Sequence, residues 1–215
     1  MMPAPIRLRA ALAGFLAFGA AMAALHFLNW GAQPRHMSNF VFQSGGWLWS
    51  LAILSITLGL ASLASVLREL SPRDKDVRLG TALLWGAGAT FLLLALFPTD
   101  PTDWPTTFGG YLHVLAAIAS ITLESSAMLV LVDAGRRDPR LGAVTGRSYA
   151  WPATIMGVGY LWGFSDGLEW AINPLVQRLM AVLMVGWLLL VTVRLQASLA
   201  SQAAPASGEA APAGR

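Results

Sequence analysis

Long apolar segments alternate with short polar segments along most of the chain. Six of the apolar segments are candidates for crossing the hydrocarbon core of a bilayer. They cover about residues 10–28, 46–67, 79–97, 108–131, 149–164 and 174–193. Lipid offers no partner to backbone N–H and C=O groups, and these runs are too long and unbroken for barrel strands, so each is expected to be a helix. The pattern predicts an all-α polytopic bundle of six transmembrane helices within residues 1–197.

The fifth segment and the C-terminal tail depart from this regular pattern. The fifth segment is short and contains Pro152 and three glycines, so we expect a kink or an extension into the residues that follow. From about Ser198 the chain consists mainly of Ala, Ser, Pro and Gly. This composition predicts a disordered cytoplasmic tail over residues 198–215.

Basic residues gather in alternate connecting segments, which predicts the orientation of the bundle. The first, third and fifth loops together carry only Arg35. By the positive-inside rule both termini are cytoplasmic, and the odd-numbered loops face outward. Most tryptophans fall near the predicted outer surface, where amphipathic rings prefer to lie. The basic positions on the predicted inner side are Arg7, Arg9, Arg68, Arg73, Lys75, Arg78, Arg136, Arg137, Arg140, Arg147, Arg194 and Arg215.

The first segment has a second interpretation. Arg7 and Arg9, an apolar run and the small residues of 20–24 also fit a cleavable signal peptide. Cleavage would leave five spans and would not change the side on which any later loop lies. The apolar run continues through Phe27 and Leu28, which favours a retained helix.

Composition narrows the class of protein further. Hydrophobic residues make up 56% of the chain and charged residues 12%, with a mean hydropathy of +0.60. Soluble domains carry about 25% charged residues, so the lipid bilayer is the expected surrounding. The absence of cysteine excludes disulfides and thiolate metal sites. The net charge of +3 is spread over short loops, so we assign it to membrane topology rather than to nucleic-acid binding.

Residues 97–113 join two apolar segments and carry most of the candidate chemistry. Asp100 either binds a ligand or has a structural role, in which it caps the following helix or accepts from nearby backbone N–H groups. His113 either binds a ligand or bonds to a neighbouring helix. The predicted outer side also collects further polar groups, of which Arg178 is expected to pair with Asp100, Asp166 or Glu169. The full set comprises His26, Arg35, His36, Asp100, Asp103, His113, Asp166, Glu169 and Arg178.

The fourth segment has the clearest pattern of small and polar residues. Gly110, His113, Ala117, Ser120 and Glu124 recur at three- and four-residue steps, which places them on one helix face. His113 and Glu124 are separated by about 20° around the axis and about 16 Å along it. A charged carboxylate within a span is costly. Glu124 therefore either belongs to a polar track running inward from the outer mouth, or bonds to hydroxyls or the cytoplasmic interface.

A metal or a haem is an alternative use of the histidines. The candidate metal ligands are His26, His36, His113 and Asp100, because imidazole and carboxylate groups bind transition metals. A b-type haem held by His26 and His113 is a further alternative, although no spacing signature supports it. The sequence contains no P-loop, dinucleotide fingerprint, Gly-x-Ser-x-Gly elbow or His-Glu-x-x-His motif. We therefore predict no cofactor.

Several of these residues resemble those of a known membrane family. Phe97-Pro98-Thr99-Asp100, followed by Gly110 and His113, resembles the bacterial and archaeal family named domain of unknown function 998. The segments Gly45–Leu48 and Val176–Leu179, with Trp187 and Leu188, fit as well, and the resemblance covers about residues 10–197. It implies a six-helix protein of the bacterial cytoplasmic (inner) membrane and no particular activity.

Three functions remain open at this stage. The first is a non-enzymatic protein that binds or moves a small or lipidic molecule through an outward-facing polar pocket. Asp100, His113 and Arg178 would line that pocket, with Glu124 lying deeper. The second is a membrane-embedded metal-dependent hydrolase, in which a bound cation activates water. The third is a structural or assembly protein whose polar residues form an interhelical network.

Overall fold

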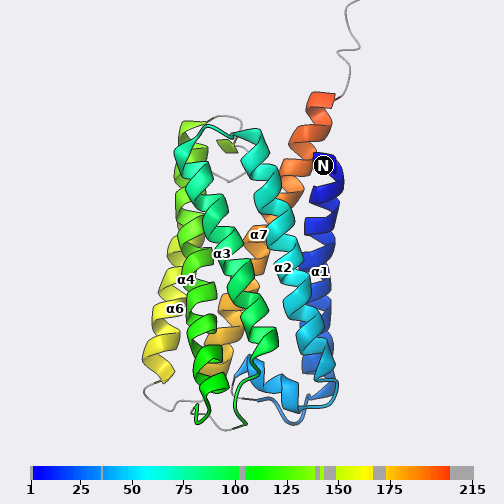
Figure 1. Ribbon diagram of the computed structural model, residues 1–215, viewed down its shortest axis with the longest axis vertical. Coiled ribbons are helices and arrows are strands. Elements are labelled where there is room, and N and C mark those ends of the chain that lie inside the picture. The colour runs from blue at the N-terminus through cyan, green and yellow to red at the C-terminus, as the bar shows by residue number, and fades with distance from the viewer. Residues whose placement is uncertain are drawn as a thin grey trace, which may run out of the picture.

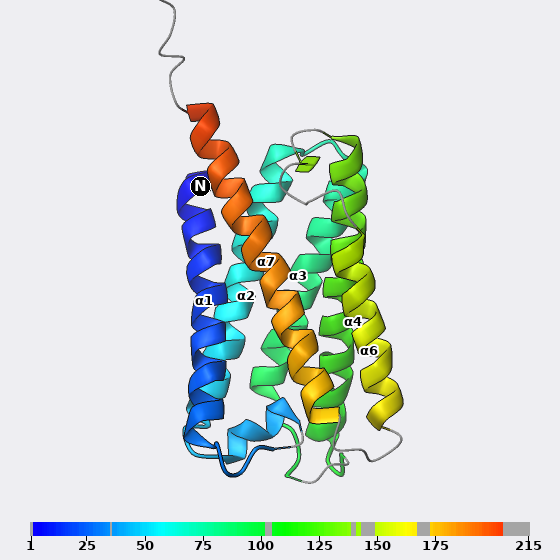
Figure 2. The ribbon, with the colours of Figure 1, turned by 180° about the vertical axis from the view of Figure 1, so that it is seen from behind.

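The computed structural model describes residues 2–34, 36–101, 105–138, 141–142, 149–166 and 173–203. Within these ranges all the regular elements are helices, which run side by side as a bundle (Figures 1 and 2). The all-α prediction is therefore confirmed. In chain order the elements are α1 (Ala4–Leu28), the 3-10 helix η1 (Met37–Phe42), α2 (Trp47–Leu70), α3 (Lys75–Leu96), α4 (Phe108–Arg137), α6 (Ala150–Asp166) and α7 (Asn173–Ala203).

Five of these helices are long and apolar enough to cross a membrane, among the residues that are described: α1, α2, α3, α4 and α7. This identifies a multi-pass membrane protein. The helix at the fifth predicted span, α6, has 17 residues. It is about 26 Å long at 1.5 Å per residue, which is less than the roughly 30 Å of a hydrocarbon core. Pro152 lies in its first turn, where proline is tolerated, and the helix continues to Asp166.

Neighbouring helices in the sequence are also neighbours in space. Helix α2 packs on α1 and α3, and α3 packs on α4. Helix α7 packs on both α1 and α6, so the last helix closes the bundle against the first (Figure 2). The short helix η1 contacts α2 and α7 and lies at the end of the bundle opposite the N-terminus (Figure 1).

A pair of glycines allows α1 and α2 to approach closely. A Cβ atom on Gly14 would lie 2.5 Å from the carbonyl oxygen of Ser55 and 2.9 Å from the backbone nitrogen of Gly59. A Cβ atom on Gly59 would lie 2.5 Å from the ring of Phe15. Small residues at helix contacts are common in membranes, where close van der Waals packing supplies much of the association energy. Gly14 and Gly59 therefore serve the packing of α1 on α2.

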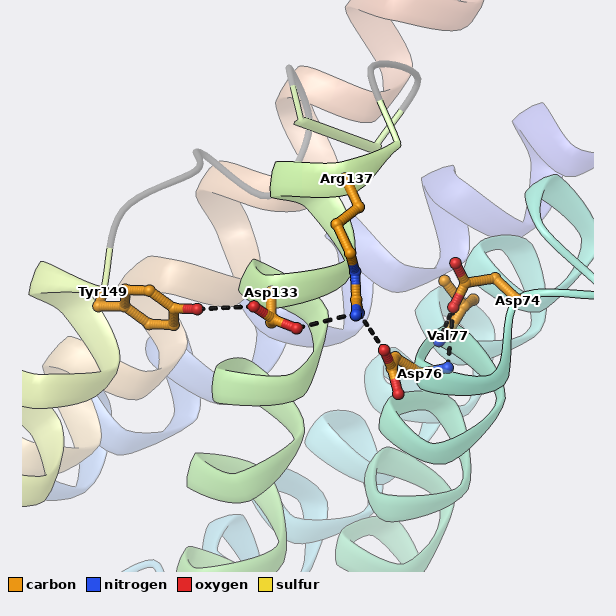
Figure 3. Close-up of polar contacts among 6 residues, drawn as sticks. All are labelled: Asp74, Asp76, Val77, Asp133, Arg137 and Tyr149. Carbon is orange, nitrogen blue, oxygen red and sulfur yellow. Dashed lines mark hydrogen bonds and ion pairs between the residues drawn. The ribbon is translucent and has the colours of Figure 1, made fainter.

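Ionic contacts join the helices at the end of the bundle where α1 begins and α2, α4 and α7 end, which we call the basic end. There Arg7 of α1 bonds to Glu69 of α2, and its guanidinium also donates to the Ser65 hydroxyl at 3.1 Å. Arg137 of α4 pairs with Asp76 of α3 and, at 3.0 Å, with Asp133 (Figure 3). These contacts bring residues of the basic loops to one end, as the charge pattern predicts.

The start of the predicted tail is wrong by several residues. Helix α7 continues to Ala203, so residues 198–203 are helical, and residues 204–215 lie outside the described ranges. Leucine, alanine and glutamine in this stretch are good helix formers, and the first proline comes only at Pro205. Leu199 also packs against the apolar core. Composition alone had grouped these residues with the Pro- and Gly-containing segment that follows.

Candidate ligand-binding cavity

The connection between α3 and α4 is organised by Asp100. One carboxylate oxygen accepts hydrogen bonds from the backbone N–H groups of Thr106, at 2.6 Å, and Thr107, at 3.0 Å. The other oxygen accepts from the Thr107 hydroxyl at 2.8 Å. The backbone N–H of Thr107, then that of Thr106, then the Thr107 hydroxyl hold the pKa of Asp100 below its usual value. Asp100 therefore accepts from backbone N–H groups of this connection, as one interpretation of the sequence expected, while Thr107 is the N-cap of α4.

Thr107 and Gly110 complete this turn. The Thr107 hydroxyl oxygen accepts from the backbone N–H of Gly110 at 3.0 Å, which caps the first turn of α4. A Cβ atom on Gly110 would lie 2.2 Å from a carboxylate oxygen of Asp100. Glycine is therefore required at position 110 to leave room for the Asp100 carboxylate.

His113 lies one turn further along α4 and bonds back to the end of α3. Its Nδ1 atom is 2.8 Å from the carbonyl oxygen of Phe97, and the side chain is buried. A carbonyl oxygen can only accept, so Nδ1 carries the proton and the neutral ring presents Nε2 as an acceptor. The ring is buried, and a charge in apolar surroundings is costly, so the neutral form is favoured. Residues Phe97, Asp100, Gly110 and His113 thus act together in closing the α3–α4 connection.

A cavity of about 100 Å³ lies inside the bundle and is lined by residues of α1, η1, α2, α3, α4 and α7. Its volume is of the same order as that of protein cavities that take up benzene. Most of the lining is apolar, including three aromatic and three methionine side chains. The aromatic and methionine lining residues are Phe18, Trp49, Phe91, Met37, Met180 and Met184, and the polar ones are Ser38, His113, Ser120, Glu124 and Gln177.

The predicted polar face of α4 opens onto this cavity. His113, Ala117, Ser120 and Glu124 all line it, so the three- and four-residue spacing identified residues that share one surface. The Ser120 hydroxyl donates to the carbonyl oxygen of Ala117 at 2.8 Å. Ser120 therefore has a partner within its own helix.

Glu124 is the most unusual group in the cavity. Its side chain is 0% exposed, and neither carboxyl oxygen has a hydrogen-bond partner in the part of the chain that is described. The interpretation in which it bonds to hydroxyls or reaches the interface does not match this geometry. An isolated charge in apolar surroundings is costly, so the neutral carboxylic acid is the favoured form in the empty cavity. Glu124 is thus available to a molecule that enters.

Arg178 lies at a different site, between α7 and the end of α1. Its guanidinium donates to Nε2 of His26 at 2.8 Å and to the carbonyl oxygens of Pro174, at 2.7 Å, and Pro34, at 2.9 Å. Nδ1 of His26 is 2.7 Å from the Met22 carbonyl oxygen. All these acceptors are neutral, and Asp100 is not among them. Of the other predicted acidic partners, Glu169 and the side chain of Asp166 lie outside what is described.

His26 and Arg178 line a second hollow, the α1–α7 groove, of about 540 Å³. The groove is mainly apolar, and small residues of both helices contribute to it. The groove and the central cavity have four lining residues in common: Phe18, Met37, Ala181 and Val185. The two hollows therefore adjoin along α1 and α7.

The histidines predicted as metal or haem ligands are dispersed. His26 lines the groove, His113 lines the cavity, and His36 precedes η1. Within the described ranges no three His, Cys, Asp or Glu side chains are close enough to share a metal ion. The predicted outer residues Arg35 and Asp103 lie outside those ranges.

Sequence reasoning missed the polar cavity residues Ser38 and Gln177 and the aromatic ones, which are Phe18, Trp49 and Phe91. Ser38 and Gln177 line the cavity, and the Gln177 side-chain oxygen accepts from the backbone N–H of Met37 at 2.9 Å. Trp49 also lines it, although its position predicted an interfacial ring. The sequence could have identified Gln177, because its polar amide lies next to Arg178 in an otherwise apolar helix.

Comparison with known proteins bears out the resemblance and adds no activity. The family model described as "Protein of unknown function (DUF998)" matches residues 11–194. No curated protein and no solved structure matches the chain. The family match includes the α3–α4 connection, the polar face of α4 and the Arg178 region, so both hollows lie within it. On this evidence the chain belongs to the DUF998 family of membrane proteins, whose function is unknown.

Proposed function

We propose that this membrane protein binds a small, largely apolar or lipidic molecule inside its helix bundle. The single observation that carries the proposal is Glu124, a fully buried carboxyl group that lines a cavity and has no hydrogen-bond partner among the described residues. Retaining such a group costs stability, and ionisable residues inside membrane spans mark functional sites by default. His113 lines the same cavity, whereas Asp100 has a positioning role, because it fixes the start of the helix that carries both residues.

The α1–α7 groove supports entry of the molecule from the bilayer. The groove adjoins the cavity through shared lining residues and is mainly apolar, so an apolar molecule could move between them without crossing water. Arg178 lines the groove, where His26 and two backbone carbonyl oxygens hold its guanidinium. This arrangement is compatible with binding and with transport.

A bulky residue at Ala117 tests the proposal. Ala117 lines the cavity, so Ala117→Phe would fill it, whereas Ala119→Phe places the same ring elsewhere on α4 and serves as the matched control. Native mass spectrometry of protein released in mild detergent would record bound small molecules. We expect a bound species in the wild type and in Ala119→Phe that is lost in Ala117→Phe. Equal occupancy in all three proteins would contradict the proposal.

We further propose six membrane spans, with α6 as the fifth and both termini in the cytoplasm of a bacterial cell. The alternating placement of basic loops supports this topology. Because the chain contains no cysteine, single cysteines report accessibility without background. Ser148→Cys and Ala171→Cys should be labelled by an impermeant maleimide from opposite sides of the membrane, with Ala32→Cys labelled from the same side as Ala171→Cys. Labelling of Ser148→Cys and Ala171→Cys from one side would show that α6 does not cross.

The two alternative functions make different predictions for the same preparations. A metal-dependent hydrolase should retain stoichiometric transition metal, which elemental analysis would detect. A structural or assembly protein should retain a partner protein through mild solubilisation, and its cellular role should survive Ala117→Phe.

A further inference from the structure

The unbonded polar atoms of the cavity indicate the kind of ligand that fits. The carboxyl oxygens of Glu124 have no partner in the described part of the chain, and the Phe97 carbonyl leaves Nε2 of His113 as an acceptor. Ser120 and the Gln177 oxygen are already bonded. Among the described lining residues there is no Lys or Arg. The cavity therefore offers one potential negative charge and no cation to balance it.

The rest of the lining also suits an organic cation. The rings of Phe18, Trp49 and Phe91 line the cavity, and aromatic faces attract cations, most strongly when water is excluded. Three methionine thioethers add polarizable, adaptable surface. An anion would meet Glu124 without any compensating positive charge. A neutral apolar molecule would fill the space but leave the carboxyl group without a partner.

We propose, on the basis of the binding function above, that the cavity binds small lipophilic ammonium ions and that Glu124 exchanges its proton for the cation. In the empty cavity Glu124 holds its proton. When the cation enters, the carboxyl O–H bond breaks, the proton leaves to water, and the carboxylate forms an ion pair with the ammonium group. Charge is conserved, because one positive charge enters the site and one leaves it.

His113 is the other titratable side chain that faces this cavity among the described residues. The lining residues from α1, η1, α2, α3 and α7 are uncharged: they are aromatic, aliphatic or thioether side chains together with Ser38 and Gln177. Arg178 and His26 line the adjoining groove instead. Proton release on binding is therefore assigned to Glu124, and His113→Gln is the control for a contribution from the imidazole.

The experiment uses benzyltrimethylammonium, which stays charged at every pH, and neopentylbenzene, its uncharged carbon isostere. Calorimetric titrations of the full chain in detergent, in buffers with different ionisation enthalpies, give both affinity and the number of protons released. We expect release of up to one proton per cation and an affinity that rises by about tenfold per pH unit while Glu124 starts neutral. Glu124→Gln should abolish proton release and weaken cation binding by roughly tenfold or more. Thr122→Ala removes a hydroxyl of α4 that does not line the cavity and that donates within its own helix, so it should change neither property.

The outcomes separate this inference from the proposed function. Neopentylbenzene that binds as tightly as the cation, or cation binding without pH dependence in the wild type, would overturn the ammonium assignment. The cavity would then still bind apolar molecules if Ala117→Phe removed that binding. Failure of both probes to bind would count against both proposals. The pH dependence is measured on the wild type, so the test does not depend on any variant folding.

Discussion

Asp100 and Glu124 are two acids associated with the same helix, and their surroundings are opposite. Both side chains are buried, with Asp100 7% exposed and Glu124 0% exposed. Asp100 accepts hydrogen bonds from two backbone N–H groups and a hydroxyl. Glu124 accepts none from the described residues. The same chemical group therefore stabilises the fold at position 100, where it is hydrogen-bonded. At position 124 it destabilises the fold, because the described residues give it no hydrogen bond.

This difference separates a structural role from a functional one. A buried polar group normally has hydrogen-bond partners, and a group without them requires another explanation. The α3–α4 connection supplies the partners of Asp100 from its own backbone. The described lining of the cavity supplies none for Glu124, which is why we assign the ligand to Glu124 and a structural role in the α3–α4 connection to Asp100.

Removing the carboxyl group of Glu124 should give the largest change in stability. Glu124→Leu should raise the free energy of unfolding by about 1–3 kcal/mol, because a buried unsatisfied polar group is replaced by an apolar one. The same variant should lose cation binding. Thermal unfolding in a fixed detergent measures the first effect and calorimetry the second. A less stable Glu124→Leu protein would show that Glu124 has a partner and would remove the contrast with Asp100.

Removing the cap at Thr107 should change the stability in the opposite direction. Thr107→Ala removes the oxygen that accepts from Gly110 and the hydroxyl that donates to Asp100, so we expect the free energy of unfolding to fall by about 1 kcal/mol. Thr106→Ala is the matched control, because its hydroxyl lies 3.4 Å from Asp100 while its backbone N–H bond is kept. An equal loss in the two variants would contradict the capping role of the Thr107 hydroxyl.

Acid should weaken the α3–α4 connection through Asp100. The folded-state pKa of Asp100 is lowered, so its stabilising effect is complete above the unfolded-state value near 3.9 and is lost as pH falls through the folded-state value. The wild-type melting temperature should therefore drop in this acid range. Asp100→Asn should melt lower at neutral pH and show a smaller further drop in acid. Parallel pH profiles for the two proteins would exclude Asp100 as the titrating group.

Breaking the ion pairs at the basic end should change the free energy of unfolding least. Arg137 lies between Asp76 and Asp133, and the Tyr149 hydroxyl donates to Asp133 at 2.8 Å (Figure 3). The Arg137 side chain is 51% exposed, and exposed ion pairs contribute little because water and salt screen them. In a double-mutant cycle of Asp76→Asn and Arg137→Gln, we expect a coupling smaller than the effect of Thr107→Ala and reduced by salt. A coupling that exceeds the effect of Thr107→Ala and does not depend on salt would show that this cluster, like Asp100, is a structural element of the fold.

The sequence predicted the helical architecture because lipid leaves the chain little choice. Apolar runs of sufficient length must form helices, and those runs predicted α1, α2, α3, α4 and α7 in order. The helices extend past the apolar runs, because α1 begins six residues earlier and α4 and α7 end six and ten residues later. The tail boundary failed because Ser198–Ala203 contains helix formers within a low-complexity segment. Helix α6 is short, as the length of the fifth apolar run predicts.

The candidate site was predicted in part. Helical spacing placed His113, Ala117, Ser120 and Glu124 on one face, and that face lines the cavity. Spacing within one helix says nothing about what lies opposite. It could not show that Gln177 and Trp49 complete the lining, or that Arg178 bonds to His26 rather than to an acid.

By itself the sequence determined the membrane location, the helical class and the register of the polar face, because these depend on local composition and the period of the helix. Only the tertiary structure decided the roles of the two acids. Whether a carboxyl group is satisfied depends on which donors other segments bring to it. The chain folds Thr106 and Thr107 back onto Asp100, whereas the six elements that line the cavity supply no donor to Glu124 from the residues described.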